Sequence, residues 1–116
     1  MSSVALQIPG LDRIRLRFLD LLEHRKVNIA RHALAAWDGE TAEEINANLE
    51  AARSILHQIA GTAGTVGYEA LGITAQHCEA QIIAHIEGPY ADLAVCPGEI
   101  IWFIDTFVEA CDGLAE

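Results

Sequence analysis

The stretch Thr41–Gly67, TAEEINANLEAARSILHQIAGTAGTVG, decides the fold. Its first four residues have the form of a capping box, in which the threonine oxygen accepts from a free backbone amide and a glutamate reaches back, so we expect a helix to begin here. Apolar residues then recur in alternating steps of four and three, at Ile45, Leu49, Ala52, Leu56, Ile59, Ala63 and Val66. Such a seam is typical of a helix that packs lengthwise in a bundle. Gly67 follows the seam and is suited to the left-handed conformation that ends a helix.

The same spacing predicts three more helices around this one. Their expected inward residues are Leu11, Ile14, Phe18, Leu22, Ile29 and Ala33 in 11–37, then Leu71, Ala75, Cys78, Ile82 and Ile86 in 68–87, and Ile100, Ile104, Phe107, Cys111 and Leu114 in a helix starting near Pro97. Turn residues separate these segments at Asp38-Gly39, Gly67 and Gly88-Pro89. No segment has the pattern of a strand. The sequence therefore predicts one domain over residues 1–116, an all-α, antiparallel, up-down-up-down four-helix bundle.

Charge and composition narrow the classes of function. The net charge is −10, and no lysine or arginine follows Arg53, which argues against nucleic acid as a partner. No basic amino-terminal segment precedes an apolar run, and nowhere do eighteen apolar residues follow one another, so we expect a cytoplasmic protein without membrane contact. The chain has no glycine-rich phosphate loop of the Walker or kinase type, so we expect neither a nucleotide site nor kinase activity of its own.

Cysteine and histidine spacing gives no metal or disulfide motif. Three cysteines without C-x-x-C spacing favour buried, reduced thiols. No Glu-x-x-His pair occurs, so the ligands of a carboxylate-bridged metal pair in a helix bundle are missing, and we expect no metal. The two tryptophans, Trp37 and Trp102, are interpreted as packing residues. On the first helix, Arg13, Arg17, His24 and Arg31 share one stripe, interpreted either as a solvated face or as the border of a docking surface for an acidic partner.

His57 stands out because glycine follows it one helical turn later, at Gly61, and again at Gly64. Glycine inside a helix costs about 1 kcal/mol relative to alanine, so bare backbone at these positions calls for a reason. His57 comes one residue after Leu56 of the apolar seam, about 100° round the helix, which predicts a boundary or outward position. An accessible imidazole beside uncovered backbone is suited to a nucleophile that accepts a group from another protein.

The segment from Leu56 to Leu71, LHQIAGTAGTVGYEAL, resembles the motif of histidine-containing phosphotransfer (HPt) domains of two-component phosphorelays. In that family a histidine is followed by glycine at four and ten residues and then by a leucine that opens the next helix, as are His57, Gly61, Gly67 and Leu71 here. The resemblance covers about residues 11–112, and the family's four-helix bundle agrees with the predicted layout.

The resemblance implies that His57 is a phosphoacceptor, a covalent carrier without a cofactor of its own. It would exchange a phosphoryl group with aspartates of response-regulator receiver domains, and a hybrid histidine kinase is a further expected partner. The receiver would supply the magnesium. Family members commonly carry a lysine three residues after the histidine, where this chain has Ala60. We hypothesise that Arg53 and Gln58 support the phosphoryl oxygens in its place, with Gly61 and Gly64 forming the docking surface.

Two alternatives stay open at the level of sequence. Ala60 in place of lysine is also expected in a helical adaptor that docks receiver domains without carrying phosphate. We expect a monomer, although two four-helix units can pair through exposed apolar residues.

Overall fold

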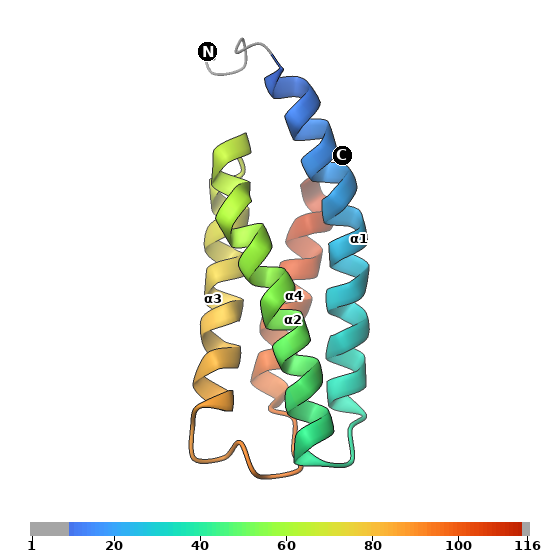
Figure 1. The fold of residues 1–116 in the computed structure, drawn as a ribbon, viewed down its shortest axis with the longest axis vertical. Coiled ribbons are helices and arrows are strands. Elements are labelled where there is room, and N and C mark those ends of the chain that lie inside the picture. Colours follow the sequence, from blue (N-terminus) through green and yellow to red (C-terminus); the bar gives the residue numbers. More distant parts are fainter. Residues whose placement is uncertain (1–9, 115–116) are drawn as a thin grey trace.

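The computed structural model describes residues 10–114 of the chain. It contains α1 (Leu11–Trp37), α2 (Ala42–Ala63), a 3₁₀ turn η2 (Gly64–Val66), α3 (Glu69–Ile86) and α4 (Gly98–Leu114). Successive helices run in opposite directions, and the bundle measures 51 × 21 × 18 Å along its principal axes (Figure 1). The part of the chain that is described has no strand. The predicted antiparallel four-helix bundle is confirmed.

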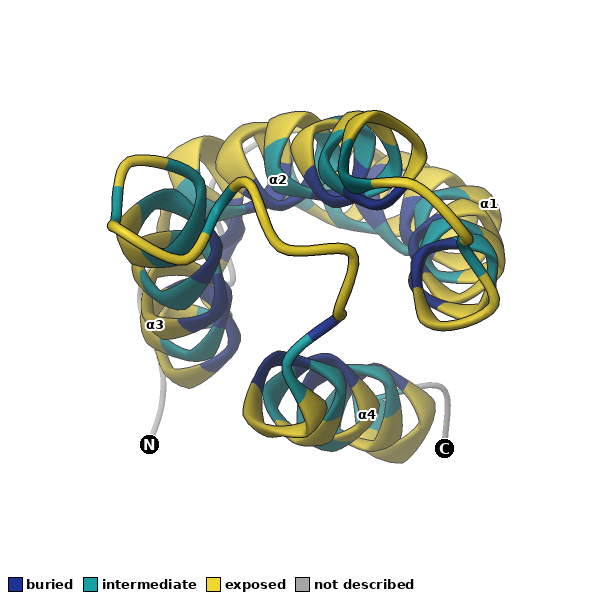
Figure 2. Cartoon of the chain, turned by 90° about the horizontal axis from the view of Figure 1, so that it is seen from below, coloured by how far each residue is buried: buried dark blue, intermediate teal, exposed yellow. Residues whose placement is uncertain are grey.

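The four helices surround one apolar core. Among the described residues α1 packs against α2 and α4, and α3 packs against the same two helices, so α2 and α4 lie on opposite sides (Figure 2). All seven residues of the apolar seam that begins at Ile45 and ends at Val66 are buried, as predicted. Burying aliphatic side chains contributes about 25 cal/mol per Å² of apolar surface, which makes this seam a main source of stability.

Local hydrogen bonds close both ends of the seam. Thr41 Oγ1 accepts from the backbone N–H of Glu44 at 3.1 Å, and the Glu44 carboxylate accepts from the backbone N–H of Glu40, one residue before the position that a capping box uses. At the other end Gly67 has a φ of +97°, the left-handed conformation predicted for it. Arg15 of α1 donates from Nε to the carbonyl oxygen of Val66 at 3.0 Å, which fixes this corner against α1.

Two features of the packing differ from the sequence prediction or were missing from it. Ile14 was expected in the core and is 55% exposed, because the amino-terminal end of α1 extends beyond the other helices (Figure 1). Gly72 is buried, and a Cβ atom there would lie 3.5 Å from Ala63 Cβ. Such a Cβ would be in ordinary van der Waals contact, so Gly72 marks a position where α2 and α3 pack together, which the sequence analysis did not assign.

Charge is unevenly distributed over the exterior. Of the seven lysines and arginines, six lie on α1, and Arg53 on α2 is the seventh. Of the helices within residues 10–114, none has the combination of length and apolar character required to cross a bilayer. The bundle thus presents one basic helix and three predominantly acidic ones.

Candidate functional site

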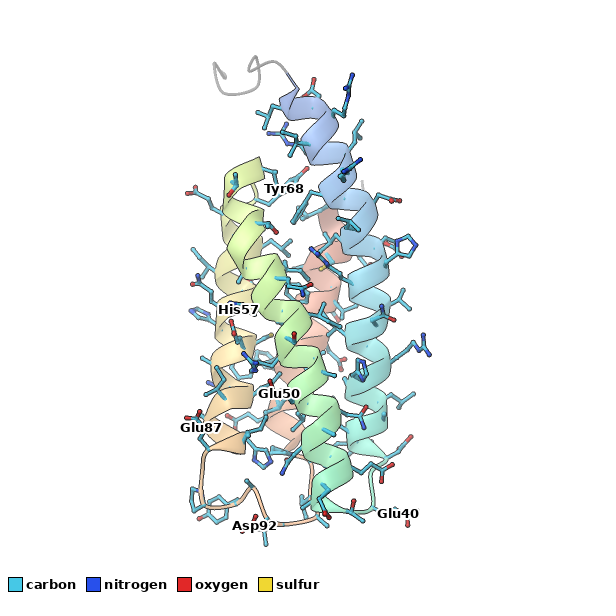
Figure 3. All side chains as sticks on the ribbon, in the orientation of Figure 1. Glu40, Glu50, His57, Tyr68, Glu87 and Asp92 are labelled. Atoms are coloured by element: carbon cyan, nitrogen blue, oxygen red, sulfur yellow. The ribbon has the colours of Figure 1, made fainter. Side chains whose placement is uncertain are left out.

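His57 lies in the carboxyl-terminal third of α2, on the side that faces α3 (Figure 3). Its backbone position follows from the seam: Leu56, one residue earlier, is completely buried, so the next side chain is turned about 100° away from the core. The His57 side chain is 71% exposed. The predicted outward position of the ring is confirmed.

Glu79 of α3 forms a hydrogen bond with the His57 ring. Its carboxylate oxygen Oε2 lies 2.8 Å from His57 Nδ1, and its side chain is only 12% exposed. A carboxylate can only accept, so Nδ1 carries the proton and donates it. In the neutral ring the proton-free nitrogen is then Nε2. The contact thus fixes the tautomer and leaves Nε2 with its lone pair directed away from Glu79.

Arg53 lies one turn before His57 and shares the same carboxylate. Its Nη1 donates to Glu79 Oε2 at 3.2 Å, and its Nε donates to Glu50 Oε2 at 2.9 Å. The hydrogen bond from Arg53 lowers the pKa of Glu50, and the same bond is the main cause that raises the pKa of Arg53. Glu50, Arg53, His57 and Glu79 therefore form one connected group across α2 and α3, called here the His57 cluster.

The two glycines after His57 leave open backbone on the outside of α2. A Cβ atom at Gly61 would meet nothing within 4 Å, and one at Gly64 would meet only Glu69 Cγ, at 3.8 Å. Neither glycine is required by a neighbouring helix. At Gly61, where the chain is α-helical and φ is negative, no feature of the fold itself explains the loss of a side chain.

Gln58 and Ala60 do not belong to the His57 cluster. Gln58 is exposed, and within residues 10–114 its side chain makes no hydrogen bond. Ala60 is half-buried and packs against the core. Of the residues predicted to support a phosphoryl group, the structure brings Arg53 next to His57 and leaves Gln58 in solvent.

The sequence analysis missed Glu79. Its position directly after Cys78 of an apolar row matches that of His57 after Leu56, so an outward boundary position was predictable. The pairing was not, because it depends on how far α3 is shifted along α2, and helical periodicity does not fix that shift. The part of the chain described here contains no group of three or more His, Cys, Asp or Glu side chains able to hold a metal ion.

No family model, no curated protein and no solved structure matches this chain.

Proposed function

We propose that this chain is a cytoplasmic, monomeric phosphocarrier that works as an HPt domain does. His57 accepts a phosphoryl group from the aspartate of a receiver domain, or from a kinase, and passes it to another receiver aspartate. The observation that carries the proposal is the exposed His57 ring whose Nδ1 is bound by the largely buried Glu79 at 2.8 Å. An imidazole with one nitrogen engaged by a carboxylate and the other free in solvent is an oriented nucleophile.

On the carrier, the transfer step requires only His57 and Glu79. The Nε2 lone pair attacks the phosphorus of the aspartyl phosphate, the P–N bond forms, and the P–O bond to the aspartate breaks, which releases its carboxylate. The ring then carries the positive charge of an imidazolium, with its proton still on Nδ1. The Glu79 carboxylate stabilises that charge from 2.8 Å. In the reverse direction the receiver carboxylate attacks and His57 leaves as neutral imidazole.

The surroundings of His57 favour a partner that brings its own metal ion. Phosphoryl transfer needs alignment and neutralisation of charge, and the His57 cluster contains two carboxylates for one guanidinium. A magnesium ion on the receiver supplies the missing positive charge. The open backbone at Gly61 and Gly64 gives the receiver a place to approach without displacing side chains of this chain.

A second candidate function is an adaptor that binds receivers without accepting phosphate. It is favoured by the contacts of Arg53, whose guanidinium is already bound to Glu50 and Glu79, and by Ala60, which packs against the core. The two functions share a docking surface and differ only in whether the P–N bond forms.

Incubation with a phosphorylated receiver distinguishes them. The carrier acquires a label that is labile in acid and stable in alkali, and His57→Gln abolishes it. His77→Gln, which alters an exposed histidine on α3, serves as the control and retains the label. Binding of the receiver without any transfer of label contradicts the carrier and establishes the adaptor.

The role of Arg53 is tested separately. In Arg53→Ala we expect the transfer rate to fall by about tenfold, the loss typical of a residue that neutralises or positions charge beside the reacting group. Arg31→Ala removes an exposed arginine of α1 and is expected to leave the rate unchanged. Equal transfer rates for Arg53→Ala and the parent would show that Arg53 has no part in the mechanism.

A further inference from the structure

A groove runs between the carboxyl-terminal half of α1 and the first turns of α4. Apolar side chains of both helices line it, namely Ala30, Leu34, Trp37 and Ile101, and its volume is about 290 Å³. Within the described residues α2, which carries His57, lies across the bundle from α4, so the groove and the His57 cluster belong to opposite sides of the bundle (Figure 2). The groove is therefore separate from the proposed phosphotransfer site.

Trp37 lines this groove, and both tryptophans of the chain are exposed. Trp37 is 55% and Trp102 is 61% exposed, more than expected from their interpretation as packing residues. Trp37 is one of the lining residues and sits next to Gly98, the first residue of α4. Trp102 comes four residues after Gly98 and three before Asp105, which also line the groove, so helical geometry puts it on the adjoining face. Exposed tryptophan is costly in water and is enriched in protein-binding surfaces.

The α1 wall of the groove has the spacing of a second helix-packing seam. Val27, Ala30, Leu34 and Trp37 follow one another in steps of three, four and three, and all four are exposed. This row is distinct from the buried row of α1, which includes Ile29 and Ala33. An apolar row with alternating steps of three and four is suited to contact with another helix lying alongside. The small side chain of Ala30 leaves room at the middle of the row.

The charge that α4 contributes to the groove is acidic. Asp105 lines it, and Glu109 lies one turn further on the same outer face of α4; in the described part of the chain neither forms a salt bridge. Lys26 of α1, the only lysine of the chain, is bound to Glu23 at 2.9 Å and to Asp112 at 2.6 Å. The residues from Gly98 to the carboxyl terminus include no lysine or arginine. The groove therefore complements a positively charged partner.

From these observations we propose that the groove between α1 and α4 binds a basic amphipathic helix of a partner protein. The apolar face of that helix enters between Leu34, Trp37 and Ile101, and its lysines or arginines meet Asp105 and Glu109. A second copy of this chain fits less well, since its net charge of −10 places further carboxylates against an acidic rim. The helix binds without covering His57, so a tethered carrier keeps its phosphotransfer face free.

Two synthetic helices of about five turns, roughly 18 residues each, test the proposal. Both have leucine at i, i+3, i+4 and i+7 and contain no tryptophan; the remaining positions are lysine in one and glutamate in the other. Trp37 lines the groove and Trp102 is the only other tryptophan of the protein, so tryptophan emission reports on this face of the bundle. We expect the lysine peptide to shift the emission to shorter wavelength and to saturate, and the glutamate peptide to leave it unchanged.

Variants then locate the binding. Leu34→Asn and Asp105→Lys are each expected to lower the affinity for the lysine peptide by about tenfold. The first removes an apolar contact, and the second reverses a charge at the rim of the groove. Ile73→Asn alters a similarly exposed residue of α3 outside the groove and is the matched control, with no expected change. All three positions are exposed, and far-ultraviolet circular dichroism checks that the bundle is intact.

Three results would overturn the proposal. The first is equal affinity for the lysine and glutamate peptides, and the second is an equal effect of Leu34→Asn and Ile73→Asn. The third is a dimer of the parent chain in sedimentation that Leu34→Asn dissociates, since the occupant is then a second copy. None of these results affects His57 labelling, so the outcome is independent of the proposed phosphotransfer.

Discussion

At the scale of single residues, the arrangement of His57 and Glu79 divides the two ring nitrogens between two tasks. Nδ1 is hydrogen-bonded to a largely buried carboxylate, while Nε2 is the nitrogen that the proposed function assigns to phosphotransfer. Because Glu79 also accepts from Arg53, its position depends on two contacts across the α2–α3 interface. In the proposed function Glu79 is therefore a positioning residue: it acts through His57 and lies on the side of the ring away from Nε2.

Glu79→Gln tests this role. The amide carries no charge and can donate as well as accept, so it stabilises neither the imidazolium nor a single tautomer. We expect phosphotransfer to fall by about 10- to 100-fold, the usual effect of removing the partner that orients a reactive histidine. Nitrogen NMR of His57 should show the Nδ1–H form in the parent and a mixture in the variant. Glu69→Gln, an exposed change on the same helix, is the control, and an unchanged tautomer in Glu79→Gln would disprove the assignment.

The three thiols give a second prediction at this scale. Burial raises the pKa of both Cys78 and Cys111 to about 12, and it also raises the pKa of Cys96. Since the thiolate is the reactive form, we expect no reaction of the native protein with Ellman's reagent at neutral pH and release of three equivalents in denaturant.

The same pKa shifts set the sign of a pH effect on stability. Above the ordinary thiol pKa of about 8.5 the unfolded chain loses protons that the folded chain keeps, so the free energy of unfolding falls as the pH rises from there towards 12. Urea denaturation between pH 8 and 10 measures it. Rapid labelling of the native protein, or stability that increases over this pH range, would contradict the buried thiols.

At the scale of helices, sequence periodicity predicted most of the fold and only part of the site. The apolar seam of α2, the turn at Gly67 and the outward position of His57 all follow from spacing along one helix, which the sequence contains directly. Properties that depend on two helices were missed. The pairing of His57 with Glu79 requires the relative shift of α2 and α3, and the packing of Gly72 near Ala63 requires their separation.

Gly61 provides the sharpest test of whether α2 keeps bare backbone for a partner. In Gly61→Ala the new Cβ meets nothing within 4 Å, so we expect α2 to gain about 0.5–1 kcal/mol in stability. If the receiver approaches this backbone, the same variant lowers the transfer rate, and Gly61→Leu lowers it further. Gly113→Ala in α4 also enters open space and is the matched control, with no expected effect on transfer. Unchanged transfer in Gly61→Leu would contradict docking at this position.

At the scale of the whole molecule, two surfaces of opposite character lie on different sides of the bundle. The groove between α1 and α4 has an acidic rim, whereas a second groove, between the amino-terminal half of α1 and the end of α2, includes Arg17 and Arg25 beside Thr62 and Thr65. Thr62 lies little more than one turn beyond His57 on α2. In the proposed function, a receiver that covers both His57 and Thr62 meets the basic side of α1, and the acidic groove stays accessible to a different partner.

Reversal of charge on α1 tests that approach. For Arg17→Glu combined with Arg25→Glu we expect association with an acidic receiver to slow by about tenfold at low salt, because both side chains border the groove that Thr62 of α2 also lines. The difference should shrink as ionic strength rises and the Debye length falls to about 8 Å or less. Arg31→Glu lies further along the predicted stripe, beside Asn28 and His32, and is expected to have a smaller effect. Stopped-flow association at several salt concentrations measures all three rates. Equal slowing by the double variant and by Arg31→Glu would mean that only the net charge of the chain affects the association rate. The basic border of the groove would then have no part in docking.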